Sequence, residues 1–240
     1  MTALRARPDP GALRAGAAAA AIALSFCAPS MYALARGIVG PSESRLASAL
    51  VSSFGGLTLP LAGIAVASVF FAAGSRSRAR ADRLVAAGAS PRSAMSGLLA
   101  TAVLVAALSC AVVGAIVVGA LRVRFHLGSA RLITTDVLGT MWALCLGGAA
   151  WTAIAIAFVA RSGRLSRAWI VVAIDVVTRL LPAGAAWIAP TNHVANLLGA
   201  PPPSGFFRAP MVSQGASVVT LLVLVAIASA VSTRRYRGQP

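Results

Sequence analysis

Long apolar segments alternate with short polar segments along the whole chain, and this alternation predicts the architecture. The apolar runs reach about 18 residues or more, the length that a helix needs to cross a bilayer. Short clusters of arginine, serine and proline separate them. We expect an all-α integral membrane protein, with one transmembrane domain over residues 1–240 and a bundle of six helices. The predicted spans are about 15–34, 49–73, 95–121, 137–160, 168–188 and 216–231.

Composition supports lipid as the solvent of this chain. Of its 240 residues, 58% are hydrophobic and only 11% are charged, whereas a soluble domain carries about 25% charged residues. A chain of this length cannot bury so much apolar surface in a single water-soluble core. We therefore exclude a soluble enzyme or a soluble binding module.

The net charge of +16 does not indicate a nucleic-acid partner, because the arginines form no continuous face. They stand in short clusters between apolar runs, as topology signals do. Most fall at the termini and in the loops on the same side of the predicted bundle. The loop at 122–131 is a local exception. The positive-inside rule then predicts a multi-pass protein of the bacterial inner membrane with both termini in the cytoplasm.

The polar loop between the second and third predicted spans, residues 75–93, has the pattern of a short amphipathic helix. One of its faces is basic, and the other is small or apolar. The basic face holds Arg76, Arg80 and Arg83, and the other face holds Ala81, Leu84, Val85 and Gly88.

The end of this loop carries signals for a helix stop and a new start. Gly88 suits a helix end, Ser90 an N-cap and Pro91 the first position of the next helix. Two interpretations of the loop stay open. It is either a docking element for a partner or a positive-inside loop whose arginines contact only lipid headgroups.

The order of the second span, the basic short helix, the run Leu-Val-Ala-Ala-Gly-Ala-Ser-Pro-Arg-Ser and the third span resembles the permease subunits of type-2 ABC exporters. In that family this loop carries a coupling helix. The resemblance extends to the region after the fifth span, residues 187–199, where family members place partly re-entrant helices on the outer side. The coupling residues that it implies are Arg76, Arg80, Arg83, Leu84, Val85, Gly88, Ser90, Pro91 and Arg92.

The resemblance implies an ATP-driven exporter in which this chain is the membrane-spanning subunit. A separate ABC ATPase subunit would dock on residues 76–88, and a second permease copy or a paralogue would complete a dimer. The chain itself has no Gly-x-x-x-x-Gly-Lys-Ser/Thr phosphate loop and no lysine from which to build one. We therefore expect neither a cofactor nor ATP hydrolysis on this chain.

Asp175 is the one carboxylate placed clearly inside a predicted span, and Arg179 follows four residues later. This spacing puts both side chains on one helix face, where they can form an ion pair. An unpaired charge at this depth costs at least about 2.5–3.5 kcal/mol. The pair is either a buried structural element or part of a substrate path.

Other chemistry has little support in the sequence. His126 and His193 fall in predicted outer loops, where we expect solvated or interfacial side chains rather than metal ligands. Cys27, Cys110 and Cys145 lie in apolar runs without metal-type spacing and are interpreted as small buried hydrophobes. The sequence holds no His-Glu-x-x-His and no Gly-x-Ser-x-Gly, so an enzyme is not expected.

Two alternatives to the exporter remain open. A proton-coupled secondary carrier would use Asp175 as its proton site, although the chain shows none of the internal repeats common in such carriers. A membrane scaffold or assembly protein that transports nothing is the other alternative.

Overall fold

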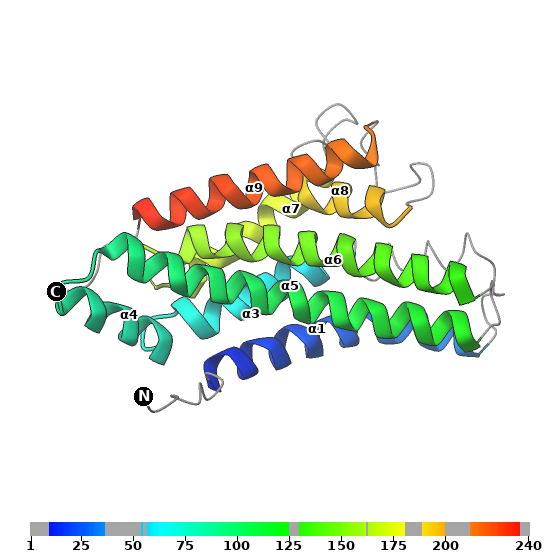
Figure 1. Ribbon diagram of the computed structural model, residues 1–240, viewed down its shortest axis with the longest axis horizontal. Coiled ribbons are helices and arrows are strands. Elements are labelled where there is room, and N and C mark those ends of the chain that lie inside the picture. The colour runs from blue at the N-terminus through cyan, green and yellow to red at the C-terminus, as the bar shows by residue number, and fades with distance from the viewer. Residues whose placement is uncertain are drawn as a thin grey trace, which may run out of the picture.

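The computed structural model describes residues 10–36, 54, 57–124, 130–161, 163–180, 189–199 and 212–235. All regular structure in this part of the chain is helical, and the helices form one elongated bundle (Figure 1). The predicted all-α class is therefore confirmed.

Four described helices are long and apolar enough to cross a membrane. They are α1 (Pro10–Ala35), α5 (Pro91–Arg124), α6 (Ala130–Val159) and α9 (Gln214–Arg235). The pair α3 (Thr58–Phe71) and α4 (Arg76–Ala86) passes the same test only if the two helices count as one element bent by 47°. The described residues thus hold four candidate spans, or five with the bent pair.

The predicted second and fifth spans are represented by shorter helices. In the second, helix α3 covers 14 residues, and in the fifth, α7 (Trp169–Leu180) covers 12 after a 3₁₀ turn at Leu165–Ala168. Residues 49–53, 55–56 and 181–188, which complete these two spans in the prediction, lie outside the described residues. The count of six spans therefore stays a prediction.

Successive long segments run in opposite directions along the bundle (Figure 1). Helix α1 begins, α9 ends and α4 lies at one end of the bundle, which we call the α4 end. Helix α8 (Pro190–Leu197) lies away from that end, beside α9. The arginine-bearing helix α4 and the arginine-bearing end of α9 lie together at the α4 end.

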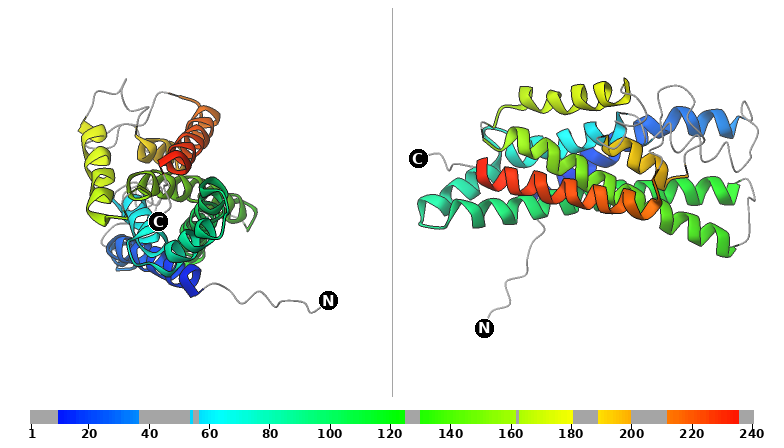
Figure 2. Two further views of the ribbon diagram at one scale, coloured as in Figure 1. Left: turned by 90° about the vertical axis from the view of Figure 1, so that its left-hand side faces the viewer. Right: turned by 90° about the horizontal axis from the view of Figure 1, so that it is seen from above.

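Helix α6 is the centre of the bundle. It packs against α3, α5 and α9, and 72% of its apolar window is buried, against 22% for α9. Figure 2 shows α1 and α9 on opposite sides of the bundle. Helix α1 instead contacts α3 and α5.

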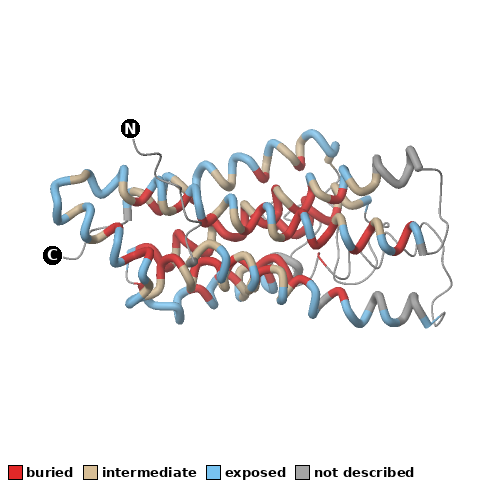
Figure 3. The backbone as a smooth tube through the Cα atoms, turned by 60° about the horizontal axis from the view of Figure 1, so that its bottom comes forward, coloured by how far each residue is buried: buried red, intermediate tan, exposed pale blue. Residues whose placement is uncertain are grey.

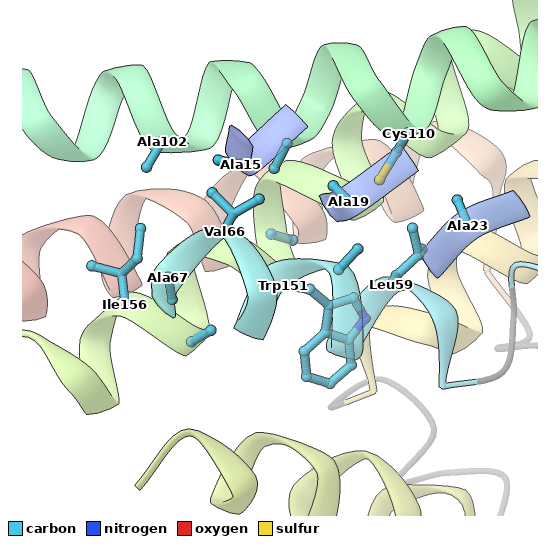
Figure 4. Packing of buried hydrophobic residues seen from close by; sticks show 14 of the residues in the cluster. Ala15, Ala19, Ala23, Leu59, Val66, Ala67, Ala102, Cys110, Trp151 and Ile156 are labelled. Atoms are coloured by element: carbon cyan, nitrogen blue, oxygen red, sulfur yellow. The ribbon is translucent and has the colours of Figure 1, made fainter. Parts of the chain in front are cut away.

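Small residues allow the helices to approach one another closely. Helix α1 presents a buried stripe of Ala15, Ala19 and Ala23 toward α3 and α5 (Figure 4). A Cβ added at Gly63 of α3 would come within 2.9 Å of the backbone of Trp151 on α6. In lipid there is no hydrophobic driving force between helices, and close packing at small residues holds the helices together instead.

Exposed residues line much of the outside of the bundle (Figure 3), and on the long helices many of them are large and apolar. Helix α5 exposes Leu104, Leu108, Val112 and Ile116 at intervals of four residues, each at least half exposed. A soluble monomer rarely leaves an apolar stripe of this length in water. The arrangement is that of a membrane-associated helical protein.

Candidate functional site

Helix α4 starts from a defined turn at the α4 end of the bundle. The hydroxyl group of Ser75 accepts a hydrogen bond from the backbone N–H of Arg78 (3.2 Å) and donates one to the carbonyl of Phe70 (2.8 Å). Ser75 is thus an N-cap that also ties the start of α4 to the last turn of α3.

The basic face of α4 is exposed as predicted. Arg76, Arg80 and Arg83 all lie at the surface, while Ala81 is buried and Val85 is half-buried. These three arginines and Leu84 line a surface recess of about 440 Å³, which we call the basic recess.

The apolar face is narrower than predicted. Leu84 is 49% exposed, although it lies on the predicted apolar face together with the buried Ala81. Ser77 and Arg78 are buried with Ala81 on the packed side of the helix. The packed face of α4 therefore includes Arg78, which lies about a third of a turn around the helix axis from Leu84.

The end of α4 and the start of α5 follow the sequence signals. Gly88 has φ +95°, its N–H donates to the carbonyl of Val85, and the N–H of Ala89 donates to the carbonyl of Leu84. This is a Schellman ending, in which the left-handed conformation favours glycine. Two residues on, the Ser90 hydroxyl accepts from the N–H of Ser93 (3.2 Å), and Pro91 is the first residue of α5. The predicted stop and restart are confirmed, and Arg92 is exposed beside them.

Arg78 is the residue of α4 that sequence reasoning missed. It is only 3% exposed, and its Nη1 donates to the carbonyls of Phe71 (3.1 Å) and Ala160 (3.2 Å). Its Nε lies 4.0 Å from the carboxylate of Asp82. Phe71 ends α3 and Ala160 follows α6, so one guanidinium holds α4 against the carboxyl ends of two helices. The four-residue spacing to Asp82 was the available signal in the sequence.

A second contact reinforces this junction. The N–H of Ala73 donates to the carbonyl of Gly163 (2.9 Å). A Cβ at Gly163 would meet the backbone of Ala73 at 2.9 Å, and Gly163 has φ +64°. The turns after α3 and after α6 are therefore joined by backbone as well as by Arg78.

Two sets of buried polar contacts, which we call together the α7–α8–α9 cluster, join α8 to α7 and to α9. The carboxylate of Asp175 on α7 is fully buried and accepts a hydrogen bond from the hydroxyl group of Thr191 on α8. The side chain of Arg179 lies outside the described residues, so the predicted Asp175–Arg179 pair stays a prediction.

His193 belongs to the same cluster, and its predicted place in a solvated or interfacial loop is wrong. It lies on α8 with no exposed surface, and its Nδ1 is 3.1 Å from the hydroxyl oxygen of Ser217 on α9. Asn196 donates to the same oxygen (2.9 Å) and to the carbonyl of Val212 (3.3 Å). These bonds attach α8 to the start of α9. His126 lies outside the described residues.

Helix α8 is buried because a glycine of α6 lets it come close. A Cβ at Gly147 would lie 2.6 Å from a methyl group of Val194 and 2.8 Å from one of Leu59. Its neighbour Gly148 is also a close-packing position, because a Cβ there would lie 3.2 Å from the carbonyl oxygen of Ala106 on α5. Pro190 at the start of a helix and the polar run after it were the signals for α8 in the sequence.

Some buried polar atoms near the bundle centre lack a protein partner within the part of the chain that the structure describes. They are Trp151 Nε1 and Thr152 Oγ1 on α6 and Asn192 Oδ1 on α8. Such atoms are rare in folded proteins. Within the described ranges no three His, Cys, Asp or Glu side chains gather as a metal site.

The opposite end of the bundle holds a further ion pair. Arg122 of α5 and Asp136 of α6 bond to each other and join the two helices there. Both belong to the loop region predicted to face outward. A structural role in holding the α5–α6 pair together accounts for them.

Comparison with protein-family models, with curated proteins and with solved structures finds no match for this chain.

Proposed function

We propose that this chain is the membrane-spanning permease subunit of an ATP-driven ABC exporter, working as a dimer with separate ATPase subunits. One observation carries the proposal. A short basic helix, α4, stands at one end of the helical bundle with three exposed arginines and is firmly attached to the long helices behind it.

The exposed side of α4 supplies a docking surface. Arg76, Arg80 and Arg83 point away from the packed face, which carries Arg78 and Ala81. A surface with several guanidinium groups suits acidic side chains of a partner protein and speeds its association.

The packed side of α4 would transmit a movement of this helix to the long helices. Arg78 connects α4 to the ends of α3 and α6, and only four residues separate the end of α4 from the start of α5. A partner that displaces α4 therefore acts on three helices together. Packed elements move as units rather than deforming continuously, so ATP-driven closure of two ATPase subunits would rock the spans against each other.

The energy source must come from another chain, because this sequence has neither a phosphate loop nor a lysine. The clustering of arginine-bearing segments at the α4 end favours the cytoplasm for that end under the positive-inside rule. The α4 helix would then face the compartment that contains ATP, with the start of α1 and the end of α9 beside it.

Charge reversal on α4 tests the docking surface. We expect Arg80→Glu with Arg83→Glu to reduce co-purification of the ATPase to below about a tenth of the wild-type ratio, because like charges facing each other across an interface cost several kcal/mol. Quantitative mass spectrometry of the tagged chain from mild detergent measures the ratio.

The matched control is Arg161→Glu with Arg167→Glu, which reverses two exposed arginines in the α6–α7 connection at the same end of the bundle. The control should keep its ATPase and insert normally. Equal retention of the ATPase by both double variants would show that α4 is not the docking element.

A second candidate, a proton-coupled carrier, is favoured by one specific observation. Asp175 is fully buried and bonded to Thr191, and a carboxylate within a membrane helix is a common proton site. In this case the α7–α8–α9 cluster, not α4, would couple energy to transport.

Asp175→Asn separates the two functions, because asparagine still accepts the hydrogen bond of Thr191 but cannot titrate. A carrier loses all solute-driven proton flux into proteoliposomes that contain a pH-sensitive dye. An exporter retains ATP-dependent transport. Activity equal to wild type at every pH would remove the carrier from consideration.

A further inference from the structure

A groove runs between α4 and the first turns of α5, beside the basic recess. It encloses about 540 Å³, and its lining includes Phe70, Arg80, Leu84, Leu98 and Thr101. It exists because α4 bends away from α3 by 47° and the chain then returns through Gly88 and Ser90 into α5.

The lining combines polar and apolar side chains. Its polar members are Ser77, Arg80, Ser93 and Thr101, and its large apolar members are Phe70, Leu84 and Leu98. From Ser93 to Thr101 the helix rises about 12 Å. Phe70, which is fully buried, adds an aromatic wall from α3.

The basic recess continues into this groove. Ser77, Arg80 and Leu84 line both, so a ligand in the groove has the guanidinium groups of Arg76 and Arg83 within the neighbouring recess. Leu84, half exposed at the junction, gives such a ligand an apolar edge to cover.

We propose that the α4–α5 groove binds an anionic phospholipid, with its phosphate at Arg80 and one acyl chain along Gly97 and Thr101. Guanidinium groups bind phosphate oxygens in a fork. Basic pockets between membrane helices on the cytoplasmic side are typical sites for anionic headgroups. A ligand with a charged head and an apolar tail matches both the guanidinium group of Arg80 and the apolar side chains of the lining, whereas a free phosphate matches the guanidinium group alone.

The lipid would support α4 from the side that faces α5, whereas Arg78 supports it from the side that faces α3 and α6. This role goes beyond the proposed function. It requires no ATPase, because it depends on the chain and the bilayer alone.

Gly97→Leu tests the groove without altering α4. A Cβ at Gly97 meets no atom within 4 Å, so a leucine side chain can extend into the groove while the backbone stays in place, and leucine favours the helix more than glycine does. Losing contact with two methylene groups of the acyl chain weakens binding about tenfold. We expect this loss for phosphatidylglycerol, titrated into the detergent-purified full chain and counted by native mass spectrometry.

Gly139→Leu is the matched control. Gly139 is also an exposed helical glycine with open space around its Cβ, but it lies on α6. It should bind phosphatidylglycerol as the wild type does. A second variant, Arg80→Gln, should lose the preference for phosphatidylglycerol over phosphatidylcholine while still binding both lipids.

Each outcome bears on the proposal. Tenfold weaker binding by Gly97→Leu alone, with selectivity lost in Arg80→Gln, supports it. Wild-type affinity in Gly97→Leu overturns the acyl-chain site. Displacement of the lipid by inorganic phosphate equally well from wild type and Gly97→Leu also overturns it, because the recess would then bind an anion only. Equal binding of both phospholipids by the wild type overturns the headgroup assignment.

Discussion

The arginines of α4 divide into two kinds, although they lie only a few residues apart. Arg76, Arg80 and Arg83 are exposed, whereas Arg78 is buried with two carbonyl partners. The carboxyl end of a helix carries partial negative charge and unpaired carbonyl groups. Arg78 satisfies carbonyls at the ends of both α3 and α6, which explains how a chain with few carboxylates buries this guanidinium.

Replacing Arg78 by methionine should destabilise the bundle. The change leaves the carbonyls of Phe71 and Ala160 without this donor, and hydrogen bonds from a charged group are worth about 1.5–3 kcal/mol. We expect a fall of this size in the free energy of unfolding, measured by denaturant titration in mild detergent micelles.

The control for this prediction is Arg76→Met, which removes an exposed arginine from the same helix and should leave stability unchanged. Arg78→Lys keeps the charge but not the fork of donors, and its stability should fall between the two. Equal stability of Arg78→Met and Arg76→Met would contradict the anchoring role.

At the scale of elements, local signals could be predicted and long-range packing could not. The end of α4 and the start of α5 depend on neighbouring residues, namely Gly88, Ser90 and Pro91, so the sequence was sufficient to place them. The exposure of Leu84 could not be predicted, because a helical wheel shows that α4 has two faces but not which angle α3 and α6 occupy.

The burial of helix α8 was even harder to predict from the sequence. Its eight residues contain Thr191, Asn192 and His193, a polar run that resembles a surface loop. The run is buried because Gly147 of α6, far away in the sequence, admits Val194. Asp175 was identified as functional or structural from its isolation in an apolar segment, but its bond to Thr191 depends on the same non-local packing.

At the scale of the molecule, the alternation of apolar and polar segments was sufficient to predict an all-α, membrane-associated bundle. The four long helices α1, α5, α6 and α9 each contain the core of a predicted span. The structure adds that the arginine-bearing ends gather at the α4 end (Figure 1). The start of α1, the end of α9 and the basic helix α4 therefore lie at the same end of the bundle.

The most direct test of the exporter proposal is to purify the tagged wild-type chain in mild detergent and identify what accompanies it by mass spectrometry. The proposal predicts a stoichiometric second subunit with a phosphate-loop ATPase domain. An intact preparation that contains the helical chain and no ATPase would contradict it, and the cluster around Asp175 would then become the place to look for energy coupling.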